Sequence, residues 1–122
     1  MAKILMVDDD KEFLEAGKNV LEAKGYTVIT AENAQEAETK INSQKPDLIF
    51  LDIMMQEADD GIVLANKLKK KGLKTPIVML SGVSKVTGYE YGKCSEVLPC
   101  SGFLEKPVSP QDLINKAKAV LK

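Results

Sequence analysis

Three charged segments, each directly after a short apolar run, contain the residues of this chain that could do chemistry. Asp8–Asp10 follow one apolar run, Asp52 follows a second, and Lys106 follows a third. Carboxylate oxygens bind hard divalent cations, and a lysine ammonium pairs with phosphate oxygens. Together the three segments indicate a site that handles a phosphoryl group.

These segments meet only if the apolar runs before them are parallel strands of one sheet. The carboxyl ends of such strands share one edge, where open α/β sheets bind their ligands. Near-continuous apolar runs are typical of a sheet covered on both faces, and helical periodicity fills the intervals between them. The sequence therefore predicts an α/β fold with a doubly wound parallel sheet and right-handed crossovers. The expected strands are Lys3–Val7, Thr27–Ala31, Leu48–Asp52, Pro76–Leu80 and Gly102–Glu105.

Helix boundaries are marked by capping residues. Gly25 is typical of a helix C-terminus, Asn33 with Glu36 forms a capping-box pattern, and Ser109 precedes a proline in the first turn of the last helix. We expect helices up to about Gly25, over about 33–42 and 61–71, and from residue 109 onward. With one more helix in the fourth crossover, two would cover one face of the sheet and three the other.

The fourth crossover, over residues 82–101, is the least regular segment. Gly88, Gly92 and Pro99 interrupt any helical period there. We expect an irregular connection with at most a short helix, and a candidate contact surface. Its two cysteines, Cys94 and Cys100, are expected to be free thiols, because a chain without histidine cannot complete a zinc site with them.

Length and charge limit the classes of protein. A chain of 122 residues fits a single domain, and 17 basic against 18 acidic side chains give no overall attraction for nucleic acid. The first apolar run is too short for a signal peptide, and no run approaches the ~18 apolar residues of a membrane span. We therefore expect a cytoplasmic protein without membrane insertion or direct nucleic-acid binding.

Four motifs follow one another along the chain: Ile4–Asp10, Pro46–Met55, Pro76–Gly82 and Gly102–Pro107. In this order and spacing they resemble the receiver domains of bacterial two-component response regulators. The resemblance covers residues 1–122 and implies a flavodoxin-like five-stranded sheet in the order 2-1-3-4-5. The chain departs from the family pattern after its second motif, where a longer acidic loop lacks the usual proline.

The resemblance implies that Asp52 accepts a phosphoryl group from a partner histidine kinase or phosphotransfer protein. It also implies that Asp8, Asp9, Asp52 and the backbone carbonyl of Met54 hold Mg²⁺. The residues by themselves favour the same roles, because strand-end carboxylates about 4.8 Å apart on neighbouring strands repel one another unless a cation lies between them. Asp10 is instead expected to cap the first helix.

Further roles follow from the resemblance alone. Lys106 would pair with one phosphoryl oxygen, while the Ser81 hydroxyl and the Gly82 amide donate hydrogen bonds to another. Phe103 would turn inward when Ser81 moves toward the phosphate, and the Lys106–Pro107 peptide bond would be cis. The chain would then be a phosphoacceptor switch, with no enzymatic activity beyond its own phosphorylation and dephosphorylation.

The competing functions are an Mg²⁺-dependent aspartyl phosphatase of the haloacid dehalogenase type, a flavodoxin-like cofactor binder, and a receiver-like scaffold that is never phosphorylated. Asp8–Asp10 lacks the Thr or Val of the phosphatase pattern and would repel a flavin phosphate. Because no DNA-binding module follows Lys122, we expect output through an unknown protein target, from a monomer or weak dimer.

A slow loss of phosphate is a further expectation. The resemblance places the residues that influence the attacking water two positions after the phosphoacceptor and two after the hydroxyl residue, which here are Met54 and Val83. Neither side chain can orient water, and ~1.4 kcal/mol in the barrier is a tenfold change in rate. We expect slower decay of the acyl phosphate in the wild type than in Met54→Asn and Val83→Glu variants under saturating Mg²⁺. Equal or faster decay in the wild type would contradict this prediction.

Overall fold

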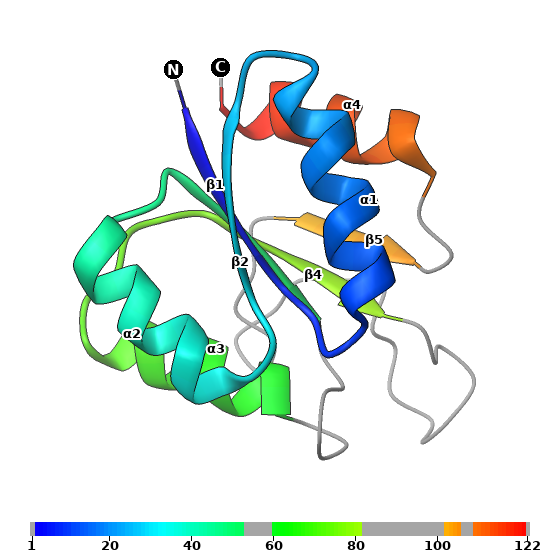
Figure 1. Ribbon diagram of the computed structural model, residues 1–122. Coiled ribbons are helices and arrows are strands. Elements are labelled where there is room, and N and C mark those ends of the chain that lie inside the picture. Colours follow the sequence, from blue (N-terminus) through cyan, green and yellow to red (C-terminus); the bar gives the residue numbers. More distant parts are fainter. Residues whose placement is uncertain (1, 53–59, 82–101, 106–108, 122) are drawn as a thin grey trace.

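The protein forms one parallel sheet between two layers of helices (Figure 1). The structure is a computed structural model that describes residues 2–52, 60–81, 102–105 and 109–121. The strand order is β2-β1-β3-β4-β5, and all pairs are parallel, which confirms the expected topology. The strands are β1 (Lys3–Val7), β2 (Thr27–Ala31), β3 (Leu48–Asp52), β4 (Ile77–Ser81) and β5 (Gly102–Glu105).

Four strands have the predicted bounds, and only β4 is shifted by one residue. Pro76 has no backbone N–H to give to a strand ladder, although its carbonyl accepts a hydrogen bond from Ile49 N at 3.0 Å. The strand therefore begins after the proline and extends to Ser81. This extension places Ser81 inside β4 at its carboxyl end.

Two helices cover each face of the sheet in the described part of the chain. α1 and α4 lie on one face, and α2 and α3 lie on the other (Figure 1). The fifth helix that sequence reasoning allowed, with the rest of the crossover at 82–101, lies outside the described residues. The helices are α1 (Lys11–Glu22), α2 (Ala34–Gln44), α3 (Asp60–Lys70) and α4 (Pro110–Val120).

The core consists of two aliphatic clusters, one on each face of the sheet. Alternate residues of β1 divide between them: Leu5 and Val7 pack under α2 and α3, whereas Ile4 and Met6 pack under α1 and α4. Because both faces are buried, the central strands need apolar residues at successive positions, which explains their continuous runs. No helix in the described ranges is long and apolar enough to cross a membrane.

The predicted helix starts are confirmed by side-chain caps. Asp10 Oδ1 accepts from the backbone N–H of Glu12 at 3.0 Å and of Phe13 at 3.3 Å. Asn33 Oδ1 accepts from Glu36 N at 2.7 Å, and Ser109 caps α4 in the same way. The Glu36 carboxylate pairs with a lysine one turn later, so the structure shows only one of the two bonds of a capping box.

The ends of α1 and α2 are marked by residues with left-handed backbone conformation. Gly25 has φ 96°, and beside it Tyr26 N donates to Leu21 O at 3.2 Å, as in a Schellman motif. The helical segment α1 itself ends at Glu22, three residues before the predicted glycine. α2 continues to Gln44, two residues beyond the expected end, and stops at Lys45 with φ 49°.

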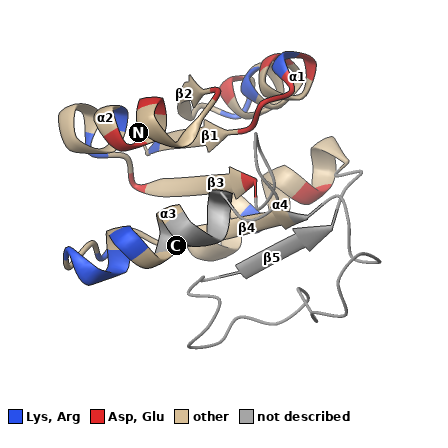
Figure 2. Ribbon diagram, turned by 90° about the horizontal axis from the view of Figure 1, so that it is seen from below, with Lys and Arg blue, Asp and Glu red and all other residues tan. Residues whose placement is uncertain are grey.

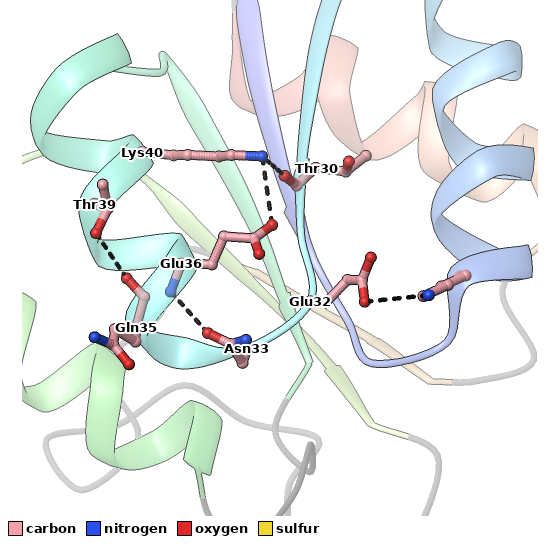
Figure 3. A network of polar contacts seen from close by, with 8 residues as sticks. Thr30, Glu32, Asn33, Gln35, Glu36, Thr39 and Lys40 are labelled. Carbon is pink, nitrogen blue, oxygen red and sulfur yellow. Dashed lines mark hydrogen bonds and ion pairs between the residues drawn. The ribbon is translucent and has the colours of Figure 1, made fainter.

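Lys40 covers the exposed edge of the sheet at β2 (Figure 3). Thr27 and Ala31 bond to β1 through their backbone groups, so the backbone groups of Thr30 between them face away from β1. Lys40 Nζ donates to the Thr30 carbonyl and pairs with Glu36 at 3.4 Å. A lysine on an edge strand satisfies a carbonyl that would otherwise be open and disfavours pairing with another chain.

Lys67 near the end of α3 and Lys71 just after it both contact Glu38 of α2 and so join the two helices. Glu38 accepts hydrogen bonds from Lys71 at 3.0 Å and from Lys67 at 3.3 Å. These bonds, the one from Lys71 foremost, hold the pKa of Glu38 below its ordinary value of 4.5. A lowered folded-state pKa means that Glu38 stabilises the fold above the ordinary pKa, and that this contribution is lost as the pH falls through the lowered value.

We therefore expect Glu38→Gln to lower the melting temperature at pH 7 by a small amount, since ion pairs at the surface contribute little. The difference from the wild type should shrink as the pH falls from about 5 through the lowered pKa. Thermal melts of both proteins across this range measure it, with Glu15→Gln on the exposed side of α1 as the matched control. A difference that grows toward low pH would contradict the assignment.

Candidate functional site

The carboxylates that follow β1 and the carboxylate that ends β3 lie together at one edge of the sheet. Val7 is paired with Leu51 in the register of β1 and β3, so Asp8 and Asp52 follow matched positions on adjacent strands. One oxygen from each of Asp8, Asp9 and Asp52 lies within 4.8 Å of the others. Figure 2 shows this edge in red, at the tip of β3 and along the connection from β1 to α1.

The backbone of the β1–α1 connection holds the three consecutive aspartates in different environments. Asp8 is fully buried, its N–H donates to Ala31 O at 3.1 Å, and its Oδ1 accepts from Asp10 N at 3.0 Å. Asp9 is exposed, while the Asp10 side chain turns to cap α1. Only Asp8 and Asp9 of the three therefore join Asp52 in the cluster, as expected from the sequence.

The donor set fits a hard divalent cation. Asp8 and Asp52 are buried carboxylates, with 0% and 4% of their surface exposed, and Asp9 gives the cluster an opening to solvent. Buried negative charges are costly unless cations or hydrogen bonds compensate them. Mg²⁺ prefers oxygen ligands and commonly uses one or two carboxylates with several waters, so this cluster suits it. The three carboxylates at this edge can therefore hold a metal ion.

β4 and β5 bring two further predicted residues toward this edge. Asp52 is paired with Leu80, so the backbone of Ser81 stands one residue farther along the neighbouring strand. Phe103, on the outer strand β5, is paired with Met79 of β4. The other predicted positions, Met54, Gly82, Val83, Lys106 and the Lys106–Pro107 peptide bond, lie outside the described residues.

Sequence reasoning did not select two charged residues near the carboxylates, Lys11 and Glu32. Lys11, the first residue of α1, has its Nζ 3.8 Å from Glu32 Oε1, so the pair joins the start of α1 to the β2–α2 connection (Figure 3). Both side chains are largely exposed, so the pair adds little to stability. The signal for Glu32 was available, because it directly follows the apolar end of β2 as Asp8 follows β1.

A model of the protein family described as the response regulator receiver domain matches residues 4–118. The chain is 37% identical to the alkaline phosphatase synthesis transcriptional regulatory protein PhoP of Bacillus subtilis, over 98% of this chain and 48% of that protein. It is 38% identical to the phosphate regulon transcriptional regulatory protein PhoB of Pseudomonas aeruginosa, over 98% and 51%. The chain thus spans about half the length of these curated relatives.

Solved structures show the same architecture. The receiver domain of the Francisella response regulator 1452 is similar with a TM-score of 0.84 and 30% identity, over 98% of this chain and 96% of that one. The chemotaxis response regulator CheY4 of Vibrio cholerae matches with a TM-score of 0.83 and 28% identity, over 98% of both chains. These neighbours support the predicted flavodoxin-like fold.

Proposed function

Because the chain belongs to the response regulator receiver domains of two-component systems, we propose that Asp52 is its phosphoacceptor. The observation that carries this proposal is the convergence of Asp8, Asp9 and Asp52 within 4.8 Å at the carboxyl edge of the sheet. Asp52 ends the central strand of the sheet, whereas the other two lie on the connection after β1. This difference in position supports Asp52 as the reacting carboxylate, with Asp8 and Asp9 as metal ligands.

Receiver domains accept phosphoryl groups from histidine kinases, and this chain would accept one from a histidine kinase or a phosphotransfer protein. An Asp52 carboxylate oxygen attacks the phosphorus of the partner's phosphohistidine. A new O–P bond forms as the N–P bond breaks, and the imidazole keeps the electron pair and takes up a proton. Positioned cations and hydrogen-bond donors accelerate such a transfer by stabilising charge on the phosphoryl oxygens.

The remaining site residues follow from their places in the family motifs. Asp8, Asp9, Asp52 and the Met54 carbonyl would hold Mg²⁺, which neutralises charge on the phosphoryl group when it is bound. Lys106 would pair with one phosphoryl oxygen, and Ser81 with Gly82 would donate to another. These assignments give every phosphoryl oxygen a positive or hydrogen-bonding neighbour.

We further propose that residues 1–122 form one receiver domain that acts in the cytoplasm as a monomer or weak dimer. Phosphorylation of the domain would alter its protein surface, through coupling of Phe103 on β5 to Ser81 on β4. Output then passes through contacts with a protein target and not through direct contact with nucleic acid or a membrane. The phosphatase and flavin-binding alternatives have no observation in their favour once the family is known.

Incubation with acetyl phosphate tests the proposal before any partner is identified. We expect the intact mass of the wild-type protein to show one added phosphoryl group in the presence of Mg²⁺, and almost none when the metal is chelated. Peptide mapping should place the group on Asp52. Uptake that is independent of metal or lies on another residue would refute the assignment, and no uptake at all would favour the receiver-like scaffold.

A further inference from the structure

A groove lies between the carboxyl end of α2 and the connection from α3 to β4, at the edge of the sheet opposite the carboxylates. Its volume is about 350 Å³, within the range of ligand-binding pockets. Its lining is mainly apolar, because Ile41, Pro46 and Leu73 form much of its wall. Asn42, Lys45 and Thr75 complete it. Thr75 Oγ1 donates to the Pro46 carbonyl at 3.4 Å and helps to hold the two sides together.

Lysines from separate parts of the chain gather around this edge. Lys45 lines the groove, and Lys74 is exposed between two lining residues. Lys3 reaches the end of α2, where its Nζ lies 3.2 Å from the Gln44 carbonyl. Lys70 ends α3, and Figure 2 shows blue gathered at this end of the helix. In the described residues, none of Lys45, Lys70 and Lys74 forms an ion pair.

Although the net charge of the chain is close to zero, acidic and basic side chains are concentrated at opposite edges of the sheet. The carboxyl edge carries the three clustered carboxylates, whereas the amino edge carries the lysines around the groove. Asp47, two residues after Lys45, is an acidic residue at this edge, and its Oδ2 accepts from Lys3 N at 2.8 Å. A ligand with negative charge would thus be attracted to the amino edge.

Lys45 has a backbone conformation that glycine adopts more easily than lysine. Its φ of 49° is in the left-handed region, where a side chain costs stability that glycine would not. A lysine here therefore places a cation at the groove at the expense of the local fold. Strained residues of this kind are often found at binding sites.

We propose that this groove binds an acidic segment of a protein partner, with one apolar side chain in the groove and carboxylates on either side of it. The apolar wall selects a protein segment over a nucleic acid, whose phosphates would use the lysines and leave Ile41, Pro46 and Leu73 without a partner. The surface lies at the opposite end of the strands from Asp52, so the partner could bind whether or not Asp52 is phosphorylated. The proposal does not depend on the phosphoacceptor role of Asp52.

Pools of synthetic peptides test the proposal by NMR titration of the full chain. In the first pool one Leu, Ile, Met or Phe is flanked by Asp and Glu; the second pool has Ser in its place, and the third has Lys in place of the acids. We expect the first pool to shift the amide signals of Asn42, Lys45, Leu73 and Thr75, with an affinity about tenfold or more above that of the other pools. Added salt should weaken this binding.

Two variants separate binding from stability. Lys45→Gly should raise the melting temperature, because it relieves the left-handed lysine, and should nevertheless weaken binding of the first pool. Lys74→Glu should weaken binding with little change in melting temperature, while the matched control Lys18→Glu on α1 should leave both unchanged. Shifts elsewhere than at the groove, equal binding of the serine pool, or tighter binding of a DNA oligonucleotide would each overturn the proposal. Full affinity in Lys45→Gly and Lys74→Glu would overturn it as well.

Discussion

Replacing Asp52 with asparagine is expected to abolish phosphoryl uptake from acetyl phosphate. An amide oxygen is a poor nucleophile and cannot form the acyl phosphate, so uptake should fall about a thousandfold or more, as it does when an enzyme loses its nucleophile. Asparagine has nearly the same shape, and Asp52 is only 4% exposed, so the packing around it should persist. Intact mass spectrometry at a fixed time, with saturating Mg²⁺, measures the loss.

Asp47→Asn is the matched control for this substitution. Asp47 immediately precedes the same strand, at the opposite edge of the sheet, and asparagine retains an oxygen to accept from Lys3 N. Phosphoryl uptake by Asp47→Asn should equal that of the wild type, because the substitution is chemically the same as Asp52→Asn but lies at the other end of the strand. If Asp52→Asn keeps the wild-type rate, or if both variants lose uptake together, Asp52 is not the phosphoacceptor.

The second large effect concerns the metal. Asp9→Asn is expected to weaken Mg²⁺ binding about tenfold or more, since it removes one charged ligand from a cluster whose oxygens lie within 4.8 Å. Asp9 is exposed, so the substitution should not disturb the core. Isothermal titration calorimetry gives the affinity directly, and the Mg²⁺-dependent rise in melting temperature gives an independent estimate.

Asp10→Asn separates coordination from general electrostatics in this experiment. It removes the same charge one residue away, and asparagine is an equally good N-cap, so α1 should be preserved. We expect only a small loss of Mg²⁺ affinity in this variant. Equal losses in Asp9→Asn and Asp10→Asn would mean that the metal responds to net charge alone and that Asp9 is not a ligand.

Local structure could be predicted from the sequence because its causes are local. Asp10, Asn33 and Ser109 cap their helices as expected, since a short polar side chain before an apolar period satisfies free amides wherever it occurs. The carboxyl ends of helices were less predictable. α2 continues past its expected end and stops at Lys45, whose backbone is in the left-handed region. Sequence signals for helix ends favour glycine, and Lys45 is held there by the surrounding structure.

The site was predicted in part. The sequence by itself determined that Asp8 follows an apolar strand, that Asp52 ends another, and that strands alternate with helices. The reason is that burial on both faces of a parallel sheet demands continuous apolar runs. It did not by itself place β1 beside β3, since strand order depends on contacts between distant segments; the resemblance to a family supplied that order.

Only the tertiary structure decided which charges act together. Three consecutive aspartates are alike in sequence, yet one is buried, one is open to solvent and one caps a helix, because the turn after β1 points each side chain differently. In the same way, Lys3, Lys45 and Lys74 are far apart in the chain and gather at one edge because parallel strands begin there. Local sequence encodes the type of each group, whereas packing of distant segments determines its neighbours.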